Sequence, residues 1–188
     1  MMIPLAILFV FSAVVFLLAT GIMFNLPSLF IDLLNFLYLD FPGGKAGFAL
    51  LVLRVSLGVL FVKHGYPKIT NLRRWAKAIK MPIPLCFLAA IAMYAGGFSL
   101  LVGFFTPFCS LSIMGTMLYA MFTEMSKGSP FTARDPFQIP HDQYQGPNGQ
   151  GDPPSWEKAF MYVIMLSVLA MLGPGLFSAD AAIYYFFK

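Results

Sequence analysis

The feature that most constrains this sequence is a long apolar stretch with an arginine inside it. Residues 50–68 read LLVLRVSLGVLFVKHGYPK, with Gly43-Gly44 before them and Pro67 near their end. About 20 consecutive apolar residues are enough for a helix to cross a bilayer. The stretch therefore predicts a membrane-spanning helix over about 46–66. A charge inside such a helix, here Arg54, indicates a functional site or a buried ion pair.

The composition of the whole chain supports a membrane protein. Of its 188 residues, 59% are hydrophobic and 11% are charged, whereas about a quarter of the residues of a typical soluble domain are charged. We therefore expect an all-α integral membrane protein. The net charge of +4 does not indicate nucleic-acid binding, because the basic residues are few and gather at the expected membrane edges.

Four further apolar runs are expected to cross the membrane. Residues 3–24 lack the cationic start and the cleavage site of a signal peptide, so we interpret them as a retained helix. The segment that follows, residues 25–45, is interrupted by polar side chains and is expected to lie at the interface. The remaining spans are predicted over about 85–105, 108–124 and 157–176.

The connections between the spans are of three kinds. Residues 69–84 are basic and carry Trp75, which predicts a short surface helix ended by Pro82 and Pro84. Thr106-Pro107 is expected to form a tight hairpin. Residues 125–155 are polar and rich in proline and glycine, which predicts a loop.

The basic residues predict the orientation of the chain. If five helices alternate, the loops at 67–84 and 125–155 share one side with the N-terminus. We expect the membrane to be a bacterial inner membrane. The positive-inside rule then places that side of the protein in the cytoplasm and the C-terminus on the opposite side. The residues on which this depends are Lys63, Lys68, Arg73, Arg74, Lys77, Lys80, Lys127, Arg134 and Lys158.

Arg54 is expected to face the protein interior. At 100° per residue it shares a face with Gly58, Phe61 and Gly65, where small residues let a second helix approach. Lys63 lies on the opposite face, towards lipid. We predict that Arg54 contacts Asp180; the alternative is that Arg54 meets carbonyls or a lipid while Asp180 or Ser178 caps a short helix.

Three stretches together resemble the DoxX family of small membrane proteins. Arg54 is followed by an apolar run and by VKHGYPK at 62–68; residues 89–107 read AAIAMYAGGFSLLVGFFTP; and residues 173–182 read GPGLFSADAA. The resemblance covers about residues 48–183. It implies a four-helix DoxX-like bundle over 46–188, with 1–45 as an extra N-terminal transmembrane helix and interfacial segment.

One position departs from the family pattern. Family members often carry a glutamate three residues before the paired glycines, and Met93 stands there in this chain. Proton or redox chemistry that depends on that carboxylate would therefore not transfer. The small residues nearby predict close helix packing: Ala92, Ala95, Gly96, Ser99 and Gly103.

The best candidate for a ligand site is a group near the end of the second span. His64, with Tyr66, Lys68 and Trp75, could hold a quinone head group, which needs a hydrogen-bond donor and an apolar slot. The alternative is that His64 bonds the backbone or a lipid head group.

A b-type haem is not expected, because His141, the second histidine, lies in a loop. No metal-ligand spacing is present, and we expect Cys86 and Cys109 to be free thiols.

The sequence contains no nucleophile–base pair, phosphate loop or nucleotide fingerprint. The resemblance implies a place in quinone-linked respiratory or sulfur redox systems. We expect a non-catalytic subunit of a larger respiratory or photosynthetic membrane complex. Other membrane subunits and lipids would be its partners, and no cofactor would be covalently bound to it. Redox cofactors or pigments would then lie on the partner subunits. Two alternatives are a quinone-dependent oxidoreductase subunit acting on thiosulfate or a related sulfur donor, and a small-molecule or lipid carrier.

Overall fold

The computed structural model describes residues 41–133 and 154–187. The predicted span at 3–24, nearly all of the interfacial segment at 25–45, Arg134 and His141 lie outside these residues. The described part is all-helical, which confirms the predicted fold class at this level. Its helices are α3 (Gly44–Thr70), α4 (Leu72–Ile79), α5 (Ile83–Val102), α6 (Thr106–Ser126), α8 (Glu157–Leu172) and α9 (Ala179–Phe187).

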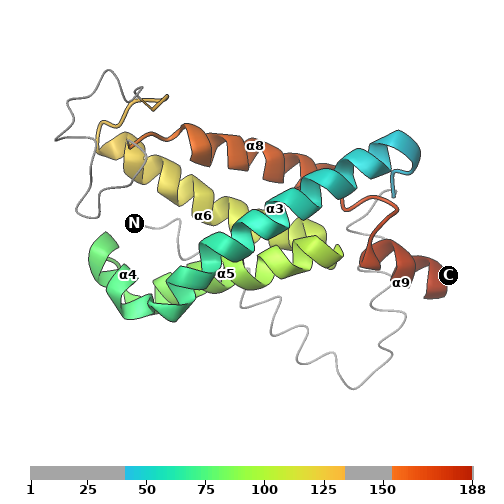
Figure 1. The fold of residues 1–188 in the computed structure, drawn as a ribbon, viewed down its shortest axis with the longest axis horizontal. Coiled ribbons are helices and arrows are strands. Elements are labelled where there is room, and N and C mark those ends of the chain that lie inside the picture. Colours follow the sequence, from blue (N-terminus) through green and yellow to red (C-terminus); the bar gives the residue numbers. More distant parts are fainter. Residues whose placement is uncertain (1–40, 134–153, 188) are drawn as a thin grey trace.

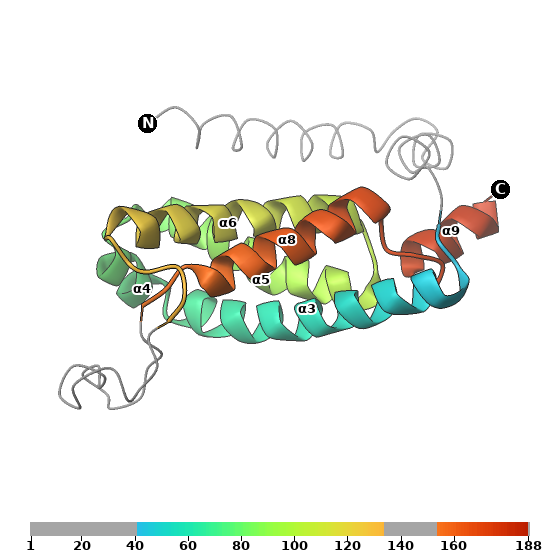
Figure 2. The same cartoon turned by 90° about the horizontal axis from the view of Figure 1, so that it is seen from above.

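The four long helices run along one axis, and the two short helices lie at opposite ends of the bundle (Figures 1 and 2). Helix α3 packs mainly against α5, α6 packs against α8, and the α5–α6 pair joins these two layers. Helix α4 turns across one end, near the ends of α6 and α8 that flank residues 127–156. Helix α9 lies at the other end, near the start of α3. The loops predicted at 67–84 and 125–155 therefore begin and end at the same end of the bundle.

Two of the described helices, α3 with 27 residues and α5 with 20, are long and apolar enough to cross a membrane. Helix α8 has 16 residues, fewer than the ~20 that a straight crossing takes. The total of four crossing helices plus one extra helix therefore stays a prediction.

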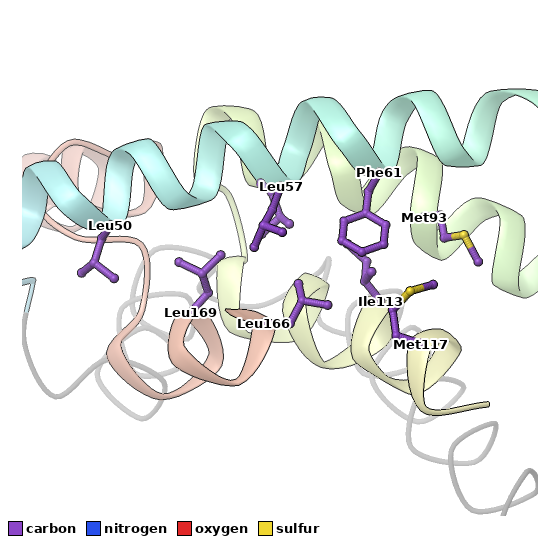
Figure 3. Close-up of a cluster of buried hydrophobic side chains, with 9 residues drawn as sticks. Leu50, Leu57, Phe61, Met93, Ile113, Met117, Leu166 and Leu169 are labelled. Carbon is purple, nitrogen blue, oxygen red and sulfur yellow. The ribbon is translucent and has the colours of Figure 1, made fainter. Parts of the chain in front are cut away.

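A single apolar core joins the four long helices (Figure 3). Leu57 and Phe61 of α3 point towards Ile113 of α6 and Leu166 of α8, and all four are at most 1% exposed. Met93 of α5 belongs to the same cluster and is 4% exposed. The outward faces of these helices carry large exposed apolar side chains, as expected of a protein surrounded by lipid.

Glycines bring α3 and α5 into backbone contact. A Cβ at Gly58 would lie 2.8 Å from the carbonyl oxygen of Gly97, and a Cβ at Gly97 would lie 2.8 Å from the amide nitrogen of Val62. A Cβ at Gly65 would lie 2.6 Å from the amide nitrogen of Tyr94. No side chain fits at these positions unless the helices separate, so the two backbones meet along several turns.

The small residues of α5 do not form one packing stripe. Gly96 faces Ile113 of α6, whereas its neighbour Gly97 faces α3. Ala95 is exposed, and Ala92 and Ser99 are half-buried. Gly103 lies beyond the helix, in the turn that follows. Helix α5 therefore packs on two sides, because the consecutive glycines point about 100° apart.

The structure corrects three predicted boundaries, each of them at a proline. Pro67 lies inside α3, which continues to Thr70. Helix α4 ends at Ile79, and Lys80 follows in the left-handed conformation; Pro82 and Pro84 begin α5 instead of ending α4. Likewise, Thr106-Pro107 begins α6, and the turn before it is formed by residues 103–105. Proline suits the first helical turn because a backbone N–H at that position would have no partner within the helix, and proline has no N–H.

We predict that Gly97→Ala lowers the stability of the purified protein by about 1–3 kcal/mol, the usual cost of overpacking a core. Gly115→Ala is the matched control, because a Cβ at Gly115 meets no atom within 4 Å. The control should leave the unfolding temperature in detergent unchanged or slightly raised. Equal unfolding temperatures for the two variants would contradict the close contact of α3 and α5.

Candidate functional site

A buried polar junction lies at the end of the bundle where α9 docks. It joins three segments that are far apart in the sequence: the first half of α3, the turn between α5 and α6, and the turn between α8 and α9. Arg54 is 1% exposed and Asp180 is 0% exposed. Two charged side chains buried this deeply require polar contacts in compensation.

The carboxylate of Asp180 caps α6 from across the chain. Its two oxygens accept hydrogen bonds from the backbone N–H of Phe105 (3.0 Å) and from that of Thr106 (3.3 Å). These groups are at the start of α6, where N–H groups have no partner within the helix. A carboxylate there also interacts favourably with the positive end of the helix dipole.

Arg54 and Asp180 both contact Gly103. Its carbonyl oxygen accepts a hydrogen bond from the backbone N–H of Asp180 (3.0 Å), and its φ of +77° favours glycine. A Cβ at this position would overlap the guanidinium of Arg54 and would contact Ser178. The turn can therefore pass between these groups only without a side chain.

Arg54 also binds the segment before α9. Its Nη2 donates a hydrogen bond to the carbonyl oxygen of Phe177 (2.5 Å). Ser178 caps α9, because its hydroxyl accepts a hydrogen bond from the N–H of Ala181 (3.1 Å). These two bonds match the alternative in which Arg54 meets a backbone carbonyl and Ser178 caps the short helix. The carboxylate of Asp180 binds the start of α6. The direct ion pair between Arg54 and Asp180 stays a prediction.

The sequence reasoning missed the role of the residues that follow Gly103. The backbone of Phe105 has a φ of +48°, which is uncommon for a residue with a bulky side chain. The N–H of Thr106 donates the second hydrogen bond to Asp180. Nearby, the buried hydroxyls of Thr106 and Ser110 have no hydrogen-bond partner within the described ranges. The Thr106-Pro107 pair was the available signal, because proline in the first turn marks the start of a helix.

The predicted ligand residues lie at the opposite end of the bundle, where α4 begins. The ammonium of Lys68 donates a hydrogen bond to the sulfur of Met93 (3.2 Å) and lies 5.5 Å from the centre of the Trp75 ring. The structure thus brings Lys68 of α3, Trp75 of α4 and Met93 of α5 together. Met93 occupies the position at which members of the resembled family often carry a glutamate.

His64 and Tyr66 point to other neighbours. The ring of His64 lies 6.2 Å from that of Tyr162 on α8 and 6.4 Å from that of Phe61. The ring of Tyr66 lies 6.2 Å from that of Tyr94 on α5. The four predicted quinone contacts therefore share one end of the bundle but divide between two helix interfaces. Quinone binding itself stays a prediction.

Other titratable groups of the described residues offer no metal site. No group of three or more His, Cys, Asp or Glu side chains could hold a metal ion there. Cys86 and Cys109 are free thiols. Glu124 pairs with Lys127 (2.6 Å) and accepts a hydrogen bond from Ser129.

We predict that Arg54→Ala lowers both the amount of protein in the membrane and its thermal stability, by about 1.5–3 kcal/mol, because it removes a charged hydrogen bond to a buried carbonyl. Lys63→Ala removes a cation from the exposed side of the same helix and should leave both nearly unchanged. The measurement is membrane abundance together with the unfolding temperature in detergent. Equal behaviour of the two variants would argue against a structural role for the junction.

Comparison with known proteins supports one assignment. No curated protein and no solved structure matches the chain. The DoxX family model matches residues 49–125, less than half of the chain, and this confirms the resemblance over α3, α4, α5 and nearly all of α6. Residues 49–125 are therefore similar to the DoxX family, and α3 and α5 within them are apolar and long enough to cross a bilayer.

Proposed function

We propose that this protein is a non-catalytic subunit of a larger energy-transducing membrane complex. The class of complex rests on the resemblance to the DoxX family. Members of that family are expected in quinone-linked respiratory or sulfur redox systems. The non-catalytic role rests on one observation, the contact between Lys68 and Met93. Redox cofactors would belong to the partner subunits.

The Lys68–Met93 contact lacks the second titratable group that proton-coupled chemistry would use. A carboxylate opposite a lysine can exchange a proton with it or with a bound quinone. A thioether cannot take up a proton at physiological pH and accepts only a weak hydrogen bond. The lysine is instead packed against Met93 and the Trp75 ring. The helix geometry is thus retained without the acid–base pair.

The base of the long polar loop supports a contact role. The ring of Phe131 lies 4.3 Å from Trp156, and both pack against Phe160. The N–H of Glu157 donates to the carbonyl oxygen of Phe131 (3.0 Å). The two ends of the loop are therefore fixed side by side at the end of the bundle that carries α4. A predicted loop whose two ends are held together in this way is a suitable place for a partner subunit to bind.

A quinone-linked oxidoreductase is the second candidate, and the same lysine favours it. Lys68 forms no ion pair in the part of the chain that the structure describes, so its ammonium could donate to a quinone carbonyl beside Trp75. On this alternative the chain would need to bind quinone alone, and His64→Ala or Lys68→Met would abolish turnover.

We predict that the tagged protein, purified from its native membrane in a mild detergent, carries other membrane subunits with it. Haem, flavin or pigment absorption should be assigned by mass identification to those companions. Once separated from them, the chain should be colourless and should not reduce quinone with thiosulfate. A lone chain that retains quinone and turns over thiosulfate would refute the subunit proposal in favour of the oxidoreductase.

A further inference from the structure

We infer that the basic groove beside α4 binds an anionic phospholipid, with the phosphate among the basic side chains and an acyl chain against the start of α5. The groove is open and has a volume of about 850 Å³. Its lining is half basic and half apolar: Arg73, Arg74, Lys77 and Lys80, with Ala76, Met81, Pro82 and Ile83.

The groove is created by the backbone at Lys80. This residue has φ 54° and ψ 42°, the left-handed conformation that ends a helix and reverses the chain. The N–H groups of Lys80 and Met81 bond the last carbonyls of α4. Pro82 then caps the start of α5. The chain reversal brings the basic face of α4 beside the first turn of α5, a helix that is apolar and long enough to cross a membrane.

Within the described residues, the basic side chains of the groove have no acidic partner. Arg73, Lys77 and Lys80 follow one another at helical spacing on a single face, and Arg74 lies beside them. All four are exposed. None forms a hydrogen bond or ion pair through its side chain in the part of the chain that the structure describes, and α4 contains no acidic residue. Four exposed cations gathered on one surface attract an anion strongly at a low-dielectric boundary.

The apolar half of the groove leads along α5 into the membrane-spanning part. Ile83 is 48% exposed, and Phe87, one turn further along the same face, is 44% exposed. An acyl chain lying on these two side chains would stay connected to a phosphate held by α4. A soluble anion would use the cations but would leave the apolar strip uncovered. The combination therefore fits a phospholipid.

The predicted topology agrees with this occupant. The basic loops are expected on the cytoplasmic side, where the leaflet is rich in anionic lipids. Clusters of lysine and arginine next to a membrane-spanning helix are typical of sites for acidic lipid head groups. Lipid binding at α4 is independent of the subunit role, because it uses the outer face of α4 and not the Lys68–Met93 contact.

Native mass spectrometry of the full-length chain in a non-ionic detergent tests the inference, with phosphatidylglycerol, phosphatidylcholine and inorganic phosphate as separate probes. We expect phosphatidylglycerol to be retained and to raise the unfolding temperature, and the other two probes to have neither effect. The double variant Arg73→Gln, Arg74→Gln should lower the affinity for phosphatidylglycerol roughly 25-fold, because each cation lost near a charged lipid surface costs about fivefold in affinity.

Lys80→Asn and Lys127→Asn form a matched pair, because each removes a lysine that follows the end of a helix. Asparagine tolerates the left-handed conformation, so Lys80→Asn should fold normally and lose affinity roughly fivefold. Lys127, which pairs with Glu124, lies outside the groove, and its substitution should leave affinity unchanged. Equal losses in both variants, or no loss in either, would refute the site. Equal stabilisation by inorganic phosphate would show a soluble-anion site instead.

Discussion

The carboxylate of Asp180 at the start of α6 is the contact on which one whole end of the structure depends. Helix α6 follows a residue in the left-handed conformation and has no capping side chain of its own. An unsatisfied N–H in a membrane costs several kcal/mol. Asp180 satisfies two such groups, while its own N–H bonds Gly103. One residue near the C-terminus therefore closes the α5–α6 turn and holds α9 in place.

Arg54 extends the same junction to α3. Its guanidinium binds the Phe177 carbonyl and lies against Gly103. The first half of α3 and the segment before α9 are thus held by polar contacts at a point where apolar packing alone would not define which segments meet. Apolar contacts are non-directional, whereas a hydrogen bond in a low-dielectric interior fixes partners and angles. The apolar contact of α9 with Phe41 adds to this chemistry.

The sequence predicted α3, α5 and the burial of an arginine well, because apolar length and periodicity are local properties. It did not predict that Asp180 binds Phe105 and Thr106, since a capping residue usually lies within a few positions of its helix. It also read Pro82 and Pro84 as the end of one helix when they begin the next. Proline restricts the backbone in both settings, and only the left-handed Lys80 beside it decides between them. The quinone candidates were close in sequence, but a helix directs neighbouring side chains to different partners.

The two ends of the bundle have different chemical characters. At the Asp180 end, the charged groups are buried and held by backbone groups, which is what a structural junction requires. At the α4 end, the cations are exposed, and the single inward lysine meets a thioether in place of an acid. Packing at position 93 needs only volume, whereas proton transfer needs a carboxylate, so the contact between α3 and α5 does not by itself require an acid–base pair. If the chain is a subunit as proposed, a partner would bind at this end of the bundle, where α4 and the Phe131–Trp156 contact lie.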